Sequence, residues 1–497
     1  MHSRRDQVQA HQFVVSRLTS GLLRADPDEL ETPVARTHRG MLIGVVVTLL
    51  FGIGFLVYGL VSPGGATAWK KPGTVVMEKE TGTRYFYDGT LRAVRNYSSA
   101  RLLAGSGEKI QKVSAASLRG TAHGSAVGIE GAPDALPAPG DLSDGPWEVC
   151  AATGVTVSGE REAVTTLVID PPEERLPLAP DRGVLVRHDS TAWLVLGGNR
   201  FRVVGGQAAL DALGYANTEP MNVSAAFLDA LPAGPDLVAP EIGGLGEPGP
   251  ELDGRPSRVG MVFEVRTPGA GRQYYVLGRR GLVPVTAMQA ALALGDRGTR
   301  DKAYGEDSAV VLPLPVGAAE AERAPSDAAS AALREAGRAL PASPPGVETV
   351  GTGRGLCVRL TPDGERGTRV ALTLGPASPD AGPAATPSGT PSGTLEPCSP
   401  VDAVQVAASH GSLVRVLGAS GRNLGSTVYL VTDTGIKYRL GDADSALALG
   451  YEVGAHAQAV PAALLRMLPT GPDLSRAAAA ASSSRATGTP DCTKPSG

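Results

Sequence analysis

One uncharged apolar run near the start of the chain limits its possible folds more than any other feature. Met41 to Val61 is 21 residues long, contains no charged side chain, and lies between Arg39 and Ser62-Pro63-Gly64-Gly65. As a helix rising about 1.5 Å per residue, the run spans roughly 31 Å, close to the thickness of the hydrocarbon core of a bilayer. We therefore predict a transmembrane helix over 41–61 after a cytosolic tail over 1–40.

A cleaved signal peptide is the alternative, because Ala66-Thr67-Ala68 resembles a cleavage site. Cleaved signals, however, carry shorter apolar runs of about 7–15 residues. The charge bias around the run is slight, and a long following domain can translocate regardless of it. The flanking charges are Arg17, Arg24, Arg36 and Arg39 before the run and Lys70, Lys71 and Lys79 after it.

The cysteines favour an outside location for the larger part of the chain. All four follow the apolar run, and an even number in a translocated domain favours disulfides, whereas the cytosol keeps thiols reduced. We predict a single-pass protein of the cytoplasmic membrane, with the N-terminus cytosolic and the large domain extracytoplasmic. The cysteines form no C-x-x-C pair, and their spacing predicts no metal site.

Composition excludes a dedicated nucleic-acid binder and indicates a turn-rich chain. The 46 Lys and Arg residues nearly balance the 50 Asp and Glu residues, without the surplus that nucleic acid requires. The 64 Gly and 40 Pro residues predict many turns and some loose linkers. The stretches predicted to be loose are 241–257, 317–346 (with a short helix over 327–339), a Pro/Ser/Thr/Gly linker over 376–400 and a tail over 477–497.

The cytosolic tail is predicted to contain an amphipathic helix. Apolar residues and one histidine recur there at steps of three and four, which is a helical period. This pattern fits a solvated helix lying near the membrane and a docking helix for a partner equally well. The residues are Val8, His11, Val15, Leu18 and Leu22.

The part after the run contains a duplicated unit. Trp193–Phe201 and Leu430–Tyr438 each predict a strand, a Gly-containing turn and a return strand that opens with a basic residue and an aromatic. Short helices closed by Leu-Gly-Tyr follow at 213–215 and 449–451. The closing strings are Leu231-Pro-Ala-Gly-Pro-Asp-Leu237 and Leu468-Pro-Thr-Gly-Pro-Asp-Leu474.

Two weaker copies predict four ββαα-like repeats. Because the repeats are unevenly spaced, they are not a simple solenoid, and the segments between them predict a β-rich core assembled from distant pieces. The fold class is thus α+β: one transmembrane helix, then an elongated domain with a discontinuous core. The predicted repeats are 74–137, 184–240, 259–316 and 424–475, and the predicted core parts are 141–183, 347–375 and 401–422.

Strings on both sides of the apolar run resemble the EccB family of actinobacterial type VII (ESX) secretion systems. The resemblance covers nearly the whole chain in order. It rests on Gln7, His11, Phe13 and Arg17-Leu18 in the tail, Ser62–Trp69 and Asn96–Leu102 after the run, Trp147–Cys150 and Leu356–Val358 in the core, and Gly435–Tyr438 and Ala446–Tyr451 in the last repeat.

The resemblance implies a structural subunit of the secretion membrane complex that supports export of small helical WXG100-type proteins. Its partners would be the EccC motor ATPase and the EccD and EccE membrane subunits. The mycosin protease and a second EccB protomer are further candidates. Peptidoglycan is another, because the family's repeats are similar to a phage-lysin cell-wall-binding fold. The tail residues Gln7, His11, Phe13, Arg17 and Leu18 would dock to partners.

The resemblance also implies a disulfide between Cys150 and Cys357, with two free buried thiols as the alternative. Cys398 and Cys492 are additional to this core pair, and the 376–400 linker is longer than the family pattern. A Cys398–Cys492 bond would bracket the last repeat, whereas free or intermolecular thiols remain open.

No catalytic or cofactor site is predicted. A Walker A loop needs Gly-Lys, and the sequence contains no such dipeptide. Gly351-Thr-Gly-Arg-Gly355 lacks this lysine and reads as a turn. The seven histidines are scattered, and we find neither HExxH nor G-x-S-x-G. The alternatives to a scaffold are a cell-wall-binding module and an ATPase without a recognisable Walker motif.

Overall fold

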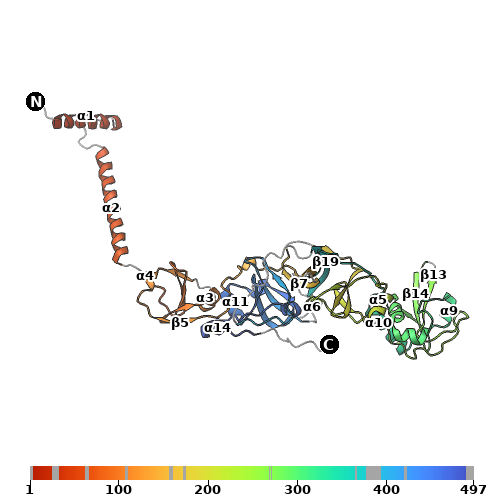
Figure 1. Cartoon of the computed structure of the whole chain (residues 1–497). Helices are drawn as coiled ribbons and strands as arrows, with labels where there is room; N and C mark the ends of the chain where they lie inside the picture. Colours follow the sequence, from red (N-terminus) through yellow and green to blue (C-terminus); the bar gives the residue numbers. More distant parts are fainter. Residues whose placement is uncertain are drawn as a thin grey trace.

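The computed structural model of the chain describes residues 4–487, apart from 25–32, 62–66, 107–109, 156–160, 172–174, 268, 270, 364–366, 377–392 and 419–422. It has the predicted α+β class, because two helices come first and small mixed sheets follow them (Figure 1). Most of the predicted 376–400 linker and the last ten residues of the predicted tail lie outside the described residues.

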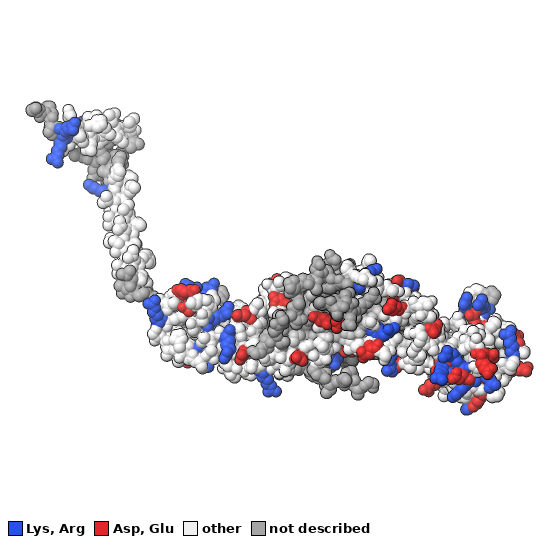
Figure 2. Space-filling model, in the orientation of Figure 1, with Lys and Arg blue, Asp and Glu red and all other residues white. Residues whose placement is uncertain are grey.

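The predicted transmembrane segment lies within the second helix. α1 spans Arg4–Arg24 and α2 spans Pro33–Val61. α2 begins before the apolar run because proline suits the first turn of a helix. Its window Thr37–Gly59 has a mean hydropathy of 2.6, and none of it is buried against the rest of the chain. Figure 2 shows no charged side chain along most of α2, and an uncharged surface of this hydropathy is typical of a helix surrounded by lipid.

The described residues after α2 form a core sheet and four small sheets in an elongated domain (Figure 1). The core sheet has the order β20-β7-β6-β18-β19-β8 and therefore mixes strands from two distant parts of the chain. Its strands are β6 (Trp147–Val155), β7 (Arg161–Ile169), β8 (Leu176–Pro177), β18 (Arg354–Pro362), β19 (Thr368–Pro376) and β20 (Ala403–Gln405), and the 3-10 helix η1 (Pro139–Asp141) precedes β6.

The first and second small sheets come on either side of β6 and β7 in the chain. The first has the order β4-β1-β2-β3-β5, with β1 (Thr74–Glu78), β2 (Arg84–Tyr87), β3 (Leu91–Val94), β4 (Gln111–Val113), β5 (His123–Val127), α3 (Tyr97–Ala104) and α4 (Ala115–Leu118). The second has the order β11-β10-β9-β12, and β17 also pairs with β9. Its elements are β9 (Arg182–His188), β10 (Thr191–Leu196), β11 (Asn199–Arg202), β12 (Met221–Asn222), β17 (Gly346–Val347), α5 (Gly206–Ala212) and α6 (Ala225–Asp229).

The third and fourth small sheets come on either side of β18 and β19. The third has the order β15-β14-β13-β16, with β13 (Val262–Thr267), β14 (Gly271–Gly278), β15 (Gly281–Val285), β16 (Leu312–Pro313), α7 (Ala287–Gly295), α8 (Arg297–Thr299), η2 (Arg300–Tyr304), α9 (Val316–Ala321) and α10 (Ala328–Arg338). The fourth has the order β23-β22-β21-β24, with β21 (Gly411–Leu417), β22 (Asn423–Thr432), β23 (Lys437–Leu440), β24 (Ala457–Pro461), α11 (Ala443–Leu449), α12 (Val453–His456), α13 (Ala462–Leu465) and α14 (Arg476–Ala481).

The small sheets pack in pairs on the two sides of the core. α3 lies against α11 and α14, so the first sheet shares one apolar cluster with the fourth. α5 lies against α7, which joins the second sheet to the third, and Gly295 allows this approach because a Cβ there would lie 2.9 Å from the Ala208 carbonyl oxygen. In space the first sheet lies nearest α2 and the third lies farthest from it (Figure 1).

Two stretches predicted to be loose are ordered, so those predictions are wrong, and the predicted tail begins with α14, in which Ala479 is buried. Residues 241–257 fold onto the third sheet, where Gly249 N donates to Ser257 O and Leu252 is buried. Residues 317–346 contain most of α9 and all of α10, and α10 is the short helix expected within 327–339. Gly and Pro content alone does not separate an ordered turn from a flexible linker, since both need those residues.

The duplicated string closes the second and fourth small sheets through the same contacts. Arg200 N donates to Pro232 O and Leu237 N donates to Arg202 O. In the fourth sheet, Lys437 N donates to Pro469 O and Leu474 N donates to Arg439 O. The string thus runs along the edge of the return strand in both sheets. The division into four repeats stays a prediction.

The glycine of each string makes room for an aromatic ring. A Cβ on Gly234 would lie 2.4 Å from Phe201, and a Cβ on Gly471 would lie 2.2 Å from Tyr438. The ring belongs to the strand that the string borders, so the glycine and the aromatic are one packing unit.

We expect Gly471→Ala to lower the free energy of unfolding by about 1–3 kcal/mol, because the new methyl group overpacks against the buried Tyr438 ring. Denaturant titration of the wild-type chain and the variant measures this change. Gly454→Ala is the control, in α12 beside the same sheet, because a Cβ there meets nothing within 4 Å, and alanine at a helical position should leave stability unchanged or raise it by up to about 1 kcal/mol. Equal effects of the two substitutions would contradict the packing argument.

Candidate assembly surfaces and the disulfide-linked core

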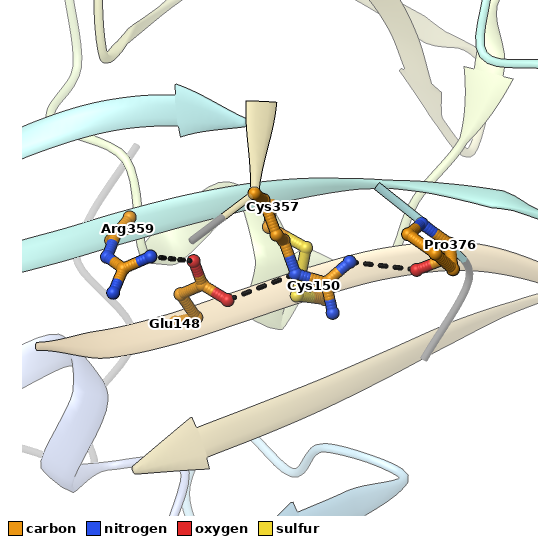
Figure 3. Close-up of a disulfide and its surroundings, with 6 residues drawn as sticks. Glu148, Cys150, Cys357, Arg359 and Pro376 are labelled. Atoms are coloured by element: carbon orange, nitrogen blue, oxygen red, sulfur yellow. Dashed lines mark hydrogen bonds and ion pairs between the residues drawn. A yellow bond between two sulfur atoms is a disulfide. The ribbon is translucent and has the colours of Figure 1, made fainter. Parts of the chain in front are cut away.

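Cys150 and Cys357 form a disulfide across the centre of the core sheet (Figure 3). Antiparallel β6 and β18 place the two residues directly opposite each other, although 207 positions separate them in the sequence. Both side chains are buried. Cys398 is also disulfide-bonded, but Cys492 lies outside the described residues, so the pairing of these two cysteines stays a prediction.

A buried carboxylate lies beside the disulfide. Glu148 on β6 has no exposed side-chain surface, and Arg175 Nε lies 3.2 Å from its Oε2. Arg359, opposite Glu148 on β18, brings Nη1 to 3.4 Å from Oε1. Burial raises the pKa of the Glu148 carboxyl, and the two guanidinium groups oppose that shift. Arg175 also donates to Pro376 O at 2.8 Å, so the cluster connects β6, β18 and β19. Figure 3 shows Glu148 and Arg359 beside the disulfide.

This cluster does not offer a metal-ligand set. The ligand atoms of Glu148, Cys150 and Cys357 lie within 4.8 Å of one another. A metal would need thiolates, however, and both sulfur atoms are bonded to each other. The group is therefore a structural crosslink with a buried ion cluster.

The predicted docking residues all lie on α1, but on different sides of it. Phe13 and Arg17 lie one helical turn apart, and the Arg17 guanidinium stacks 5.7 Å from the centre of the Phe13 ring. At about 100° per residue, Leu18 points roughly 140° away from Phe13 and close to His11. Gln7 lies on the same side as His11. The five exposed residues therefore divide into a Phe13/Arg17 face and an opposite face.

The buried Lys437 is a feature that the sequence analysis missed. Its side chain is 1% exposed and donates from Nζ to Leu468 O inside the fourth small sheet. Burial lowers the pKa of Lys437 to about 7. In the second sheet, Arg200 occupies the corresponding place, pairs with Asp229 at 3.3 Å and stacks on Trp193. The sequence did contain a signal for this burial, because Lys437 lies between Ile436 and Tyr438 in Gly-Ile-Lys-Tyr.

Gly351–Gly355 forms the turn that the sequence predicts. Arg354 N donates to Gly351 O at 3.1 Å, and the chain then enters β18. This geometry starts a strand. It lacks the helix N-terminus and the lysine that hold phosphates in a Walker loop.

Comparisons with known proteins agree over most of the chain. A family model described as type VII secretion system ESX-1, transport TM domain B, matches residues 1–486. The chain is 27% identical over 511 residues to the "ESX-3 secretion system ATPase EccB3" of Mycolicibacterium smegmatis, covering 95% of this chain and 89% of that protein. It is 27% identical over 495 residues to the "ESX-5 secretion system ATPase EccB5" of Mycobacterium tuberculosis, covering 96% and 92%.

Two solved structures share the fold. A chain in the structure of an intact ESX-5 inner membrane complex aligns with a TM-score of 0.60 at 23% identity, covering 96% of this chain and 95% of that one. A chain in the structure of an EccB3 dimer from the ESX-3 core complex aligns with a TM-score of 0.61 at 26% identity, covering 82% and 99%.

The buried Lys437 predicts a pH dependence of stability. The ordinary lysine pKa of 10.5 applies in the unfolded chain and a pKa of about 7 in the folded chain. Between these values the unfolded chain binds more protons, so the free energy of unfolding of the wild type rises with pH in this window. Methionine carries no proton, so its own contribution does not change with pH. We therefore expect the free energy of unfolding of Lys437→Met minus that of the wild type to be highest at pH 7 and below. This difference should fall by about 1–4 kcal/mol by pH 10.

Urea titrations at pH 6, 8 and 10 measure this difference. Lys112→Met is the control, because Lys112 is exposed, and its difference from the wild type should stay constant. A constant difference for Lys437→Met as well would contradict the burial argument.

Proposed function

Because the chain belongs to the EccB family of type VII (ESX) secretion systems, we propose that it is a structural subunit of an ESX membrane complex. It supports the export of small helical WXG100-type proteins by scaffolding the channel and its extracytoplasmic part. The observation that carries this proposal is an exposed apolar helix that leads into an elongated, internally crosslinked domain. Such an architecture supplies an anchor and a spacer.

The chain crosses the cytoplasmic membrane once, with α1 in the cytosol and the sheets outside. The Cys150–Cys357 disulfide supports this orientation, because such bonds persist in oxidising compartments and not in the cytosol. The sheets then lie beyond the outer end of α2, with the first small sheet nearest to α2 and the third small sheet farthest from it.

The partners proposed for this chain are the EccC motor ATPase and the EccD and EccE membrane subunits. The EccB3 dimer among the solved structures supports a second protomer as a further partner. Although the relatives carry the word ATPase in their names, the sequence of this chain contains no Gly-Lys dipeptide to build a Walker loop. The partner motor therefore supplies the energy for transport, and this chain supplies geometry.

We expect a Phe13→Ala/Arg17→Ala double variant to insert normally into the membrane but to lose its place in the complex. The two side chains form one exposed stacked pair on α1, and truncating an aromatic anchor and its arginine costs an interface about 1–3 kcal/mol. The yield of motor ATPase and multi-span subunits that co-purify with the tagged full chain should therefore fall roughly tenfold.

Gentle detergent extraction, native sizing and mass spectrometry measure that yield. Gln12→Ala, on the same helix outside the stacked pair, is the control and should leave the particle intact. Wild-type chain recovered alone would contradict the scaffold proposal. An unchanged yield from the double variant would remove only the docking role of Phe13 and Arg17.

The orientation predicts the oxidation state of the core cysteines in the cell. Blocking free thiols before lysis and mapping peptides without reduction should recover Cys150 and Cys357 as one crosslinked pair. The same domain retained in the cytosol, without residues 1–61, should yield two blocked thiols, because the cytosol keeps them reduced. Blocked thiols in the membrane-anchored chain would contradict the proposed orientation.

A further inference from the structure

α1 exposes an apolar stripe that no other described part of the chain covers. Val8, Val15, Leu18 and Leu22 are 57%, 46%, 59% and 83% exposed. At about 100° per residue, these four positions fall within roughly 80° around the helix. The stripe runs along most of a 21-residue helix and is interrupted once, by the exposed His11 between Val8 and Val15, and exposed apolar faces of this kind mark interaction sites.

The charge of α1 favours an anionic surface. Residues 4–24 contain four arginines and one aspartate, a formal charge of +3, and Figure 2 shows blue at one end of this helix. Arg4 lies about one turn before Val8, at the start of the stripe. A long basic side chain at such a position can extend to lipid headgroups while an apolar face lies deeper. The cytoplasmic leaflet carries the anionic lipid that attracts such segments.

The connection to α2 keeps α1 at the membrane. Eight residues, 25–32, separate Arg24 from Pro33. At about 3.3–3.6 Å per residue, a segment of that length reaches about 30 Å at most. The apolar window of α2 begins at Thr37, only one turn beyond Pro33. In Figure 1 α1 lies across the direction of α2, and a helix in that orientation runs along the membrane plane when α2 crosses it.

We propose that the Val8/Val15/Leu18/Leu22 stripe binds the anionic lipid surface of the cytosolic leaflet, in the headgroup region. The stripe is the face of α1 opposite the Phe13/Arg17 pair, so binding lipid leaves that pair exposed to the cytosol and available to a protein partner. This inference uses the proposed function only in taking α2 as the membrane span with α1 on the cytosolic side.

The test measures the depth of α1 residues in reconstituted full-length chain. Val15→Cys and Leu18→Cys place a fluorescent label on the stripe, and Gln9→Cys and Ser16→Cys place the same label on the polar side as matched controls. The wild-type chain, labelled without reduction, gives the background from its own four cysteines. The vesicles contain phosphatidylcholine with or without phosphatidylglycerol, and the quencher is a lipid spin-labelled near its headgroup.

We expect lipid-borne quenching at positions 15 and 18 to exceed that at 9 and 16 by about twofold or more, and to fall when phosphatidylglycerol is omitted. Equal quenching at all four positions would overturn the proposal. Weak lipid quenching with proximity between labels on two chains, rising with the protein-to-lipid ratio, would assign the stripe to a second copy and also overturn it. Flotation of the vesicles shows separately whether α2 has inserted, so failure of the membrane span is distinguishable from failure of this inference.

Discussion

In the middle of the core sheet, β6 and β18 run antiparallel and bring residues 207 positions apart into direct opposition. The rest of the domain is organised around this contact. One half of the chain carries the first sheet, β6, β7 and the second sheet, and the other carries the third sheet, β18, β19 and the fourth sheet. Exchanging β6 with β18, β7 with β19 and β8 with β20 leaves the strand order unchanged when read from the other edge. The chain therefore forms β6 and β7, continues through the second and third small sheets, and adds β18 and β19 only afterwards, so the core sheet is completed late in the sequence.

Two tyrosines fix the segments that lead into the central strands. Tyr215 donates to Pro345 O just before β17, and Tyr451 donates to Pro137 O before β6, both at 2.9 Å. Burial raises the pKa of both hydroxyls, so they remain donors. The disulfide closes a loop of 207 residues, which is worth about 5 kcal/mol in the chain-entropy account. That is a large share of the about 5–15 kcal/mol that stabilises a typical domain. The disulfide thus holds the two central strands together, and the two tyrosines hold the segments that precede them.

Local signals in the sequence predicted the class of the fold but not how its parts pair. The uncharged run of 21 residues was sufficient for the membrane helix, and the Leu-Pro-x-Gly-Pro-Asp-Leu strings revealed the duplication. The order of the core strands depends on contacts between residues far apart, which no local pattern encodes. The ordered turns at 241–257 were missed for a different reason, because Gly and Pro occur both in ordered turns and in flexible linkers. The helical period identified α1, whereas its division into two faces appears only when each residue is placed around the axis.

The residues that the second and fourth small sheets share point to a packing role. Leu231, Leu237 and Tyr215 are buried, and so are Leu468, Leu474 and Tyr451 at the matching positions. The basic residue that opens the return strand is not used in the same way twice, since Arg200 pairs with Asp229 whereas Lys437 donates to a buried carbonyl. If the sheets were copies of one binding site, exposed polar positions would be the ones kept alike, because they would contact the ligand. The duplication keeps these buried contacts together with one partly exposed ion pair, formed by Arg202 and Asp236 in the second sheet and by Arg439 and Asp473 in the fourth. Most of what the two sheets share is therefore explained by packing within each sheet.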